Sequence, residues 1–340
     1  MNETFGILPK GRRNLITDVA GVTVGHCTLA HGAVQTGVTA LIPHQGDLFH
    51  DRCPAAVHVI NGFGKSMGLV QVQELGCIET PLLLTNTLSA GTAYTACVRY
   101  MLARNVQIGR EESTVNPAIL ECNDGYLNDI RGLHVTEDDV RAALAAAGES
   151  FALGAVGAGR GMSCYQLKGG IGSASRVFEI GGKSYTLGAL VMTNFGTLVD
   201  LMIAGKPLGR SLAKTPESAK GSCIMILATD APLSSRQLAR LARRAQSGLA
   251  RTGAVTEHGS GEIALAFSTA NRIRTAETLQ SAAFLNDGSL DPVFRAGTET
   301  VKESIIRSML EAETVTGRDG HTRLSLRVAL KNAGLASREK

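Results

Sequence analysis

Short apolar runs of strand length alternate with amphipathic stretches along the first half of the chain. The runs are bounded by glycine and rich in Val and Leu, as expected of strands in a sheet. They begin at Gly21, Gly37, Ala55 and Pro81 and read GVTVGHCTLA, GVTALIP, AAVHVING and PLLLTN. Helical patterns cover 89–103 and 136–147, and the second opens on Thr136 followed by three acids, a favourable helix start. This alternation predicts a mixed α/β protein.

A polar stretch interrupts the pattern in the second half. Residues 204–221, AGKPLGRSLAKTPESAKG, combine Gly, Pro, Ser and Lys, and we expect an exposed loop there. The apolar run 223–229 predicts a buried strand, and 234–250 carries leucines at helical spacing. No repeat of roughly 20 to 50 residues is present. We therefore expect one domain over 1–340.

Composition narrows the classes of function. Hydrophobic residues make up 44% and charged residues 19% of the 340 residues, which indicates a folded globular protein. The net charge is only +4 and Trp is absent, so neither phosphate-backbone binding nor base stacking is expected, and no nucleic acid is predicted as a partner. Seven cysteines without a CxxC pair favour reduced core residues over a disulfide framework.

The sequence also lacks the signals of a membrane protein, a secreted protein, a zinc hydrolase and a phosphate-binding protein. No window reaches the roughly 20 apolar residues of a membrane span, and the first residues do not resemble a signal peptide, so we expect a cytoplasmic protein without a membrane partner. The eight histidines form no HExxH pair, and the glycine-rich stretch 154–176 lacks the GxxxxGK[ST] phosphate motif. We expect no metal and no cofactor.

The first candidate for chemistry is Gly221-Ser222, at the junction of the polar stretch and the apolar run. If the bond between them were cut, Ser222 would carry a hydroxyl nucleophile and a free α-amine. Such an amine has a pKa of about 7.7 to 8.0 and can accept the hydroxyl proton near neutral pH. Gly221 offers no side chain to hinder attack on its own carbonyl. A simple turn is the alternative reading of this common dipeptide.

The sequence HGSGE, directly before the apolar run IALAFS, is the second candidate. In an extended segment Ser260 and Glu262 point the same way, so a carboxylate would orient a hydroxyl in the manner of a catalytic relay. A polar turn is the alternative. Asn194 ends another apolar run, where its amide could stabilise the oxyanion of an acyl-transfer intermediate or simply cap the strand.

Seven segments together resemble one family in their order along the chain. They are GRRNLITDVAGVTVGH, LLLTNT, ECNDGYLNDIRG, GMSCYQLKGGIGSASR, LVMTNFG, GSCIMILATDAPL and HGSGEIALAFSTAN, spread through roughly residues 6–271. They closely resemble the L-aminopeptidase D-Ala-esterase/amidase (DmpA) family, which includes the β-peptidyl aminopeptidases.

The resemblance implies a fold and an activity. It implies a four-layer α/β/β/α sandwich similar to N-terminal-nucleophile hydrolases and a precursor that cuts itself into chains 1–221 and 222–340. It also implies that Ser222 is the nucleophile, that Ser260 and Glu262 support it, and that Asn194 belongs to the oxyanion site. A homo-oligomer, a tetramer of cleaved heterodimers, is expected on the same ground.

For the substrate, the resemblance assigns Glu121 to a free ammonium group, which would make the enzyme an aminopeptidase for short peptides, amides or esters. Some members carry a tyrosine two residues after this glutamate, where the chain has Asn123, with Tyr126 three residues further on. The sequence leaves open which of the two serves the site, and whether α- or β-amino substrates are preferred.

Two alternative functions fit the sequence less well. An amino-acid acyltransferase of similar architecture, like the ornithine acetyltransferases, uses a threonine nucleophile, and Ser222 argues against it. An inactive binding or scaffold relative would have lost the nucleophile or a partner, whereas all candidate residues are present.

Overall fold

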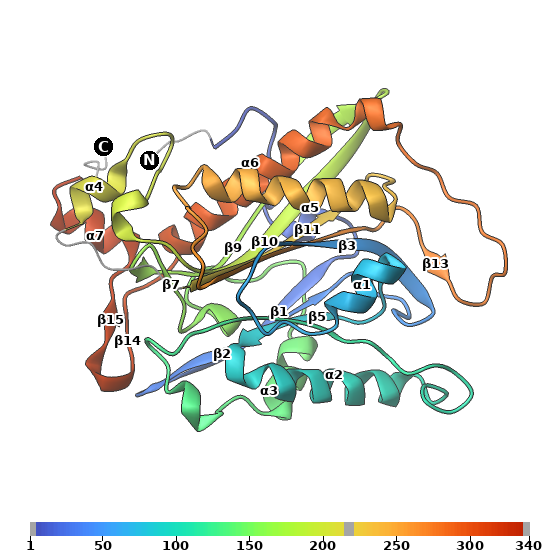
Figure 1. Cartoon of the computed structure of the whole chain (residues 1–340), viewed down its shortest axis with the longest axis horizontal. Coiled ribbons are helices and arrows are strands. Elements are labelled where there is room, and N and C mark those ends of the chain that lie inside the picture. The colour runs from blue at the N-terminus through green and yellow to red at the C-terminus, as the bar shows by residue number, and fades with distance from the viewer. Residues whose placement is uncertain (1–4, 214–220, 336–340) are drawn as a thin grey trace.

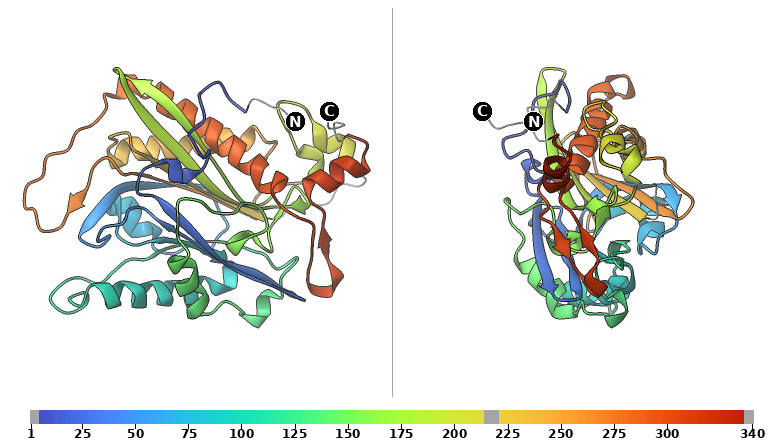
Figure 2. Two further views of the ribbon diagram at one scale, coloured as in Figure 1. Left: turned by 180° about the vertical axis from the view of Figure 1, so that it is seen from behind. Right: turned by 90° about the vertical axis from the view of Figure 1, so that its left-hand side faces the viewer.

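The computed structural model describes residues 5–213 and 221–335, and in this part of the chain two β-sheets lie face to face between two layers of helices (Figure 1). The helices α5 and α6 cover the outer face of one sheet, and α2 and α3 cover the outer face of the other (Figures 1 and 2).

The smaller sheet has four strands in the order β1-β2-β5-β6. Its strands are antiparallel except for the parallel pair β5 and β6. Their bounds are β1 Thr23–His31, β2 Val34–Ile42, β5 Leu82–Asn86 and β6 Ala118–Cys122, and the covering helices are α2 Ala90–Arg104 and α3 Glu137–Ala145.

The larger sheet has seven strands, with β13-β3-β12-β11-β10-β9 in order and β4 paired to β3. The central strands β11 and β12 are parallel, which a crossover through α5 explains. The strands are β3 Asp51–Gly62, β4 Cys77–Ile78, β9 Gly170–Ile180, β10 Lys183–Asn194, β11 Gly221–Thr229, β12 Ser260–Ser268 and β13 Ile273–Arg274, and the helices are α5 Ser235–Ala250 and α6 Asp291–Leu310.

Shorter elements connect these layers. They are the helices α1 Leu69–Leu75, α4 Leu208–Leu212 and α7 Leu326–Asn332 and two hairpins, β7 Ser163–Cys164 with β8 Leu167–Lys168 and β14 Val315–Thr316 with β15 Thr322–Arg323.

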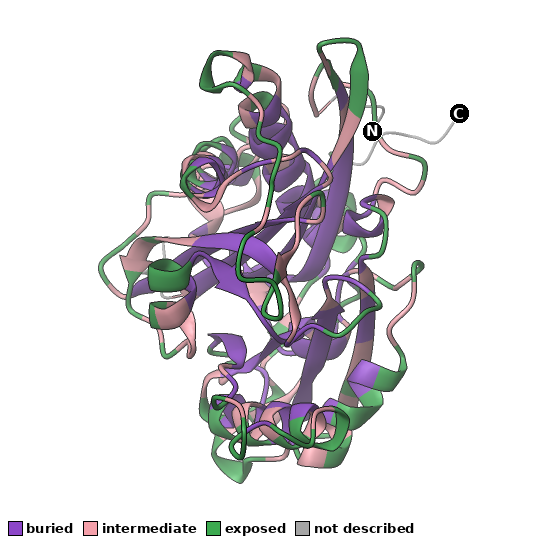
Figure 3. Ribbon diagram, turned by 90° about the vertical axis from the view of Figure 1, so that its right-hand side faces the viewer, coloured by how far each residue is buried: buried purple, intermediate pink, exposed green. Residues whose placement is uncertain are grey.

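Three apolar clusters fill the spaces between layers (Figure 3). Strand alternation explains them, because neighbouring residues of a central strand point to opposite faces. In β11, Ile226 packs between the sheets, whereas Leu227 packs against α5 beside Leu241. The four-layer α/β/β/α sandwich is therefore confirmed.

Several local predictions are confirmed with small shifts. The helix predicted from Thr136 is α3, and the Thr136 hydroxyl caps it by accepting from the Asp139 amide. The apolar run after the polar stretch is β11, which begins at Gly221. The predicted loop 204–221 contains the short helix α4, which the sequence did not indicate, and residues 214–220 lie outside the described part of the chain.

Two features are absent from the described residues 5–213 and 221–335. No group of three or more His, Cys, Asp and Glu side chains in these ranges is arranged to hold a metal ion. No helix there is both long and apolar enough to cross a membrane.

Candidate functional site

The ends of three adjacent strands bring the candidate residues together. Asn194, the last residue of β10, lies opposite Ser222 near the start of β11 in the antiparallel ladder. On the other side of β11, Ser222 pairs with Gly261 of β12 in the parallel ladder. Residues far apart in sequence thus meet at one end of three neighbouring strands of the larger sheet.

Ser222 lies next to the bond that it was predicted to cut. Its hydroxyl donates a hydrogen bond of 2.8 Å to the Gly221 carbonyl oxygen, and the residue is only 6% exposed. A Cβ atom on Gly221 would lie 2.0 Å from the Asn194 carbonyl oxygen, so the close approach of the two backbones requires glycine here. A Cβ atom on Gly261 would lie 3.0 Å from the Ser222 hydroxyl, so this glycine leaves room for it.

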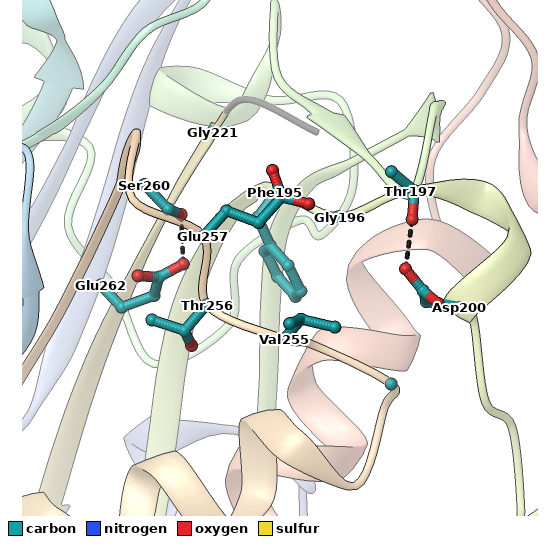
Figure 4. A pocket seen from close by; sticks show the side chains of 11 residues that line it. Phe195, Gly196, Thr197, Asp200, Gly221, Val255, Thr256, Glu257, Ser260 and Glu262 are labelled. Atoms are coloured by element: carbon teal, nitrogen blue, oxygen red, sulfur yellow. Dashed lines mark hydrogen bonds between the residues drawn. The ribbon is translucent and has the colours of Figure 1, made fainter. Parts of the chain in front are cut away.

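Ser260 and Glu262 form the pair that strand alternation predicted. Both are buried, and the Ser260 hydroxyl donates a hydrogen bond to Glu262 Oε1 (Figure 4). Burial raises the pKa of Glu262, and the bond from Ser260 offsets part of this effect. Among the described residues, Ser260 makes no hydrogen bond to Ser222, so the predicted relay contact is not formed in the uncut chain.

Asn194 is held rigidly by bonds to both ends of its amide. Its Oδ1 accepts from the Ser163 amide at 2.9 Å, and its Nδ2 donates to the Asn123 carbonyl oxygen at 2.9 Å. An amide nitrogen carries two hydrogens, and this bond uses one of them. Asn194 also lines the cavity described below.

A buried lysine fixes the segment that holds Asn194. Lys168 is fully buried, and its ammonium donates to the carbonyl oxygens of Gly159, Met162 and Gly169 at 2.7 to 3.0 Å. Burial lowers the pKa of Lys168 well below its usual range. These bonds tie together the turn that presents the Ser163 amide.

Glu121, at 3% exposure, is held at the end of the smaller sheet. Its Oε1 accepts from the Lys65 amide at 2.6 Å, and its Oε2 accepts from the Thr87 hydroxyl. It forms no ion pair with any residue in the described ranges. The carboxylate is thus oriented by neutral donors, and no cationic side chain of the described ranges is paired with it.

A cavity of about 830 Å³ connects these groups. Its walls include Ser222, Asn194, Glu121, Asn123 and Tyr126. The volume lies within the range of small-molecule sites, about 300 to 1,000 Å³. The structure therefore places the predicted nucleophile and the predicted ammonium-binding carboxylate in one cavity.

Ser260 and Glu262 line a different, small cavity of about 20 Å³ (Figure 4). Gly221 lines both this cavity and the larger one. In the uncut chain, Gly221 therefore forms part of the wall of each cavity.

The two residues that the sequence left open both line the large cavity but differ in their contacts. The Asn123 side chain closes a tight turn by accepting from the Gly125 amide at 2.9 Å. The Tyr126 ring stacks on His321 with a centroid distance of 4.6 Å, and its exposed fraction is 39%. Of the two, only Tyr126 carries a hydroxyl.

Sequence reasoning missed three groups that shape the site, namely Lys65, Thr87 and Arg323. Thr87 lies within the LLLTNT segment, one of the segments that carried the resemblance. Lys65 lies in the segment NGFGK directly after strand β3, and a charged residue at the end of a strand was a usable signal of a site. Arg323 lies beyond the segments that carried the resemblance, and nothing local marks it.

Comparison with known proteins identifies the family of the chain. A model of peptidase family S58 matches residues 14–323. The chain is 38% identical to the β-peptidyl aminopeptidase BapA of Sphingosinicella microcystinivorans, covering 92% of this chain and 85% of the relative.

Solved structures are also similar over nearly the whole chain. A protein from Pyrococcus horikoshii OT3 matches with a TM-score of 0.95 and 50% identity, covering 98% of this chain and 96% of that one. The L-aminopeptidase D-Ala-esterase/amidase of Ochrobactrum anthropi, described as a variant of the Ntn hydrolase fold, matches with a TM-score of 0.89 and 37% identity, covering 98% and 97%. The chain therefore belongs to peptidase family S58 and is a serine aminopeptidase with the N-terminal-nucleophile hydrolase fold.

Proposed function

We propose that the chain cuts its own Gly221–Ser222 bond and then uses Ser222 to release a small amino-terminal residue from short peptides, amides or esters. One observation carries the proposal. The Ser222 hydroxyl lies 2.8 Å from the Gly221 carbonyl oxygen, in a cavity that also contains the unpaired carboxylate of Glu121.

The self-cleavage step uses groups already in contact. Ser222 Oγ attacks the Gly221 carbonyl carbon, the C–N bond to Ser222 breaks, and the hydroxyl proton passes to the departing nitrogen. Gly221 is then joined to Ser222 Oγ as an ester. Water hydrolyses this ester and leaves a carboxylate on Gly221 and a free amine on Ser222.

Substrate hydrolysis repeats the chemistry with a new acyl group. The free amine of Ser222, with a pKa of about 7.7 to 8.0, accepts the hydroxyl proton as Oγ attacks the substrate carbonyl. The departing amine takes that proton, and water hydrolyses the resulting acyl-enzyme. Ser260 and Glu262 position the nucleophile once Gly221 has left, and the Asn194 amide donates to the oxyanion.

Glu121 selects substrates that carry a free amine. A charge-assisted hydrogen bond between its carboxylate and an ammonium is stronger than a bond between neutral groups, and an acylated nitrogen offers no charge. The names of the relatives, β-peptidyl aminopeptidase and L-aminopeptidase, support a small α- or β-amino residue at this position.

A pair of chromogenic substrates tests the proposal. The p-nitroanilide of a small amino acid should be hydrolysed at least about tenfold faster than its N-acetyl derivative, since a charged bond contributes roughly 1.5 to 3 kcal/mol. Glu121→Gln should raise KM for the free-amine substrate and reduce the difference. Equal hydrolysis of both compounds by the unmodified protein would contradict the proposed selection of a free amine by Glu121.

A further inference from the structure

The cavity that contains Ser222 and Glu121 also has two cationic side chains in its wall, Lys65 and Arg323. Neither forms an ion pair with a residue of the described ranges. The cavity therefore combines one unpaired carboxylate with two unpaired cations, an arrangement that suits a ligand carrying both charges.

Arg323 is held in place by neutral contacts that leave its charge unpaired. Its guanidinium lies over the Tyr126 ring, 3.8 Å from the centroid, and its Nη1 donates to the Gln166 carbonyl oxygen at 3.2 Å. Its Nε is buried and has no hydrogen-bond partner among the described residues. Its Nη1 has a second hydrogen and its Nη2 donates to no described residue, so these donors remain for an acceptor that enters the cavity.

The hairpin β14–β15 that carries Arg323 is fastened to the segment after Glu121 by hydrogen bonds. Arg318 donates from its backbone amide to the Leu127 carbonyl oxygen and from its side chain to the Gly125 carbonyl oxygen. His321 Nδ1 donates to the Tyr126 carbonyl oxygen at 2.9 Å. These contacts fix Arg323 relative to β6, the strand that carries Glu121, and limit the entropy lost when it binds a ligand.

Lys65 is a weaker candidate than Arg323 for binding an anionic group of a ligand. Its ammonium lies over the Phe63 ring, 4.4 Å from the centroid, and its own backbone amide holds Glu121. It is therefore adjacent to the carboxylate that takes the substrate ammonium. A planar guanidinium also matches a carboxylate with two parallel bonds, which an ammonium does not provide.

We propose that Arg323 binds the free carboxylate of a dipeptide whose ammonium pairs with Glu121. This inference rests on the proposed function and specifies its substrate class as short zwitterionic peptides rather than peptide amides. The two ends of the substrate are then held by opposite charges, with the scissile carbonyl presented to Ser222 between them.

A dipeptide and its carboxy-terminal amide test this assignment, because they share the amine and the scissile bond and differ only in the terminal charge. For the unmodified protein, kcat/KM for the acid should exceed that for the amide by about ten- to a hundredfold. Arg323→Gln should bring this ratio close to one, mainly by raising KM for the acid. Arg323→Lys, which keeps the charge without the fork, should retain an intermediate ratio.

Lys65→Gln is the matched comparison, since it removes the other cation of the same cavity. It should preserve the preference for the acid. Equal kcat/KM for acid and amide in the unmodified protein, or a preference lost in Lys65→Gln and kept in Arg323→Gln, would overturn the assignment. Thermal unfolding of each variant checks that the fold persists.

Failure of the proposed function gives a different result. If the unmodified protein hydrolyses neither compound, the aminopeptidase proposal fails, and both compounds become stable ligands. Calorimetric binding then decides the carboxylate subsite by itself. Tighter binding of the acid than of the amide, lost in Arg323→Gln, supports it, and equal binding contradicts it.

Discussion

Ser222 and Asn194 are direct partners across the antiparallel ladder of β10 and β11. This register brings the Asn194 backbone so close to Gly221 that a Cβ atom there would lie 2.0 Å from the Asn194 carbonyl oxygen. The same register therefore positions the predicted oxyanion donor, the predicted nucleophile and the glycine whose carbonyl it would attack. The chemistry that we propose depends on how these two strands pair.

Gly261 is expected to be necessary for self-cleavage. In Gly261→Ala, the new methyl group would lie 3.0 Å from Ser222 Oγ and 2.8 Å from the Phe63 carbonyl oxygen, so the hydroxyl or the backbone must move. A displacement of about 1 Å can cost on the order of a hundredfold in rate. The fraction of cleaved chain after a fixed time, read from a denaturing gel, measures the effect.

Gly259 supplies the control for this substitution, two residues earlier. A Cβ atom on Gly259 meets nothing within 4 Å, so Gly259→Ala should cleave at nearly the unmodified rate. Equal cleavage of the two alanine variants would show that space around the Ser222 hydroxyl does not limit the reaction.

The pair formed by Ser260 and Glu262 is expected to support turnover rather than folding. Ser260→Ala or Glu262→Gln should lower kcat by about a hundredfold or more, the usual scale for groups that orient and stabilise. Steady-state kinetics with a free-amine p-nitroanilide measures this change.

Ser268, at the opposite end of β12, is the matched control for this pair. It is also buried, and its hydroxyl donates to the Ala231 carbonyl oxygen at 2.7 Å. Ser268→Ala should lower the stability by about 1 kcal/mol with little change in kcat. If all three variants keep the unmodified kcat, Ser260 and Glu262 form only a structural turn.

Local patterns predicted the strands, the helices and the cap at Thr136 because those signals lie within a few residues of one another. The pairing of Ser260 with Glu262 was predicted for the same reason, and the structure confirms that their side chains meet. The sequence did not indicate that Lys65 and Thr87 orient Glu121, because these contacts join different elements. Arg323 reaches the cavity only through the packing of a hairpin far along the chain.

The roles of the site residues and the cleavage remain predictions. The structure shows that the residues share a location, and the family shows the class of enzyme.

Asp124 is expected to make stability depend on pH near neutrality. Burial raises the pKa of its carboxyl from 3.8 to about 7, and its Oδ2 has no hydrogen-bond partner among the described residues. A raised carboxyl pKa favours the folded state at low pH, and this contribution is lost as pH rises from about 4 through about 7.

Urea unfolding at several pH values tests this expectation. Between pH 5.5 and 7 the unmodified protein should lose about 2 kcal/mol relative to Asp124→Asn, at about 1.4 kcal/mol per pH unit. Because asparagine does not titrate, the difference between the two proteins isolates Asp124. A difference that is constant across this range would mean that Asp124 is already ionised at pH 5.5 in the folded protein.

Denaturing mass measurement of the purified protein tests the central claim most directly. The unmodified chain should yield two fragments, one ending at Gly221 and one beginning at Ser222, and the Ser222→Ala chain should remain at full length. Cleavage of the Ser222→Ala protein at this same bond would contradict the account, because no hydroxyl would be left to attack the Gly221 carbonyl.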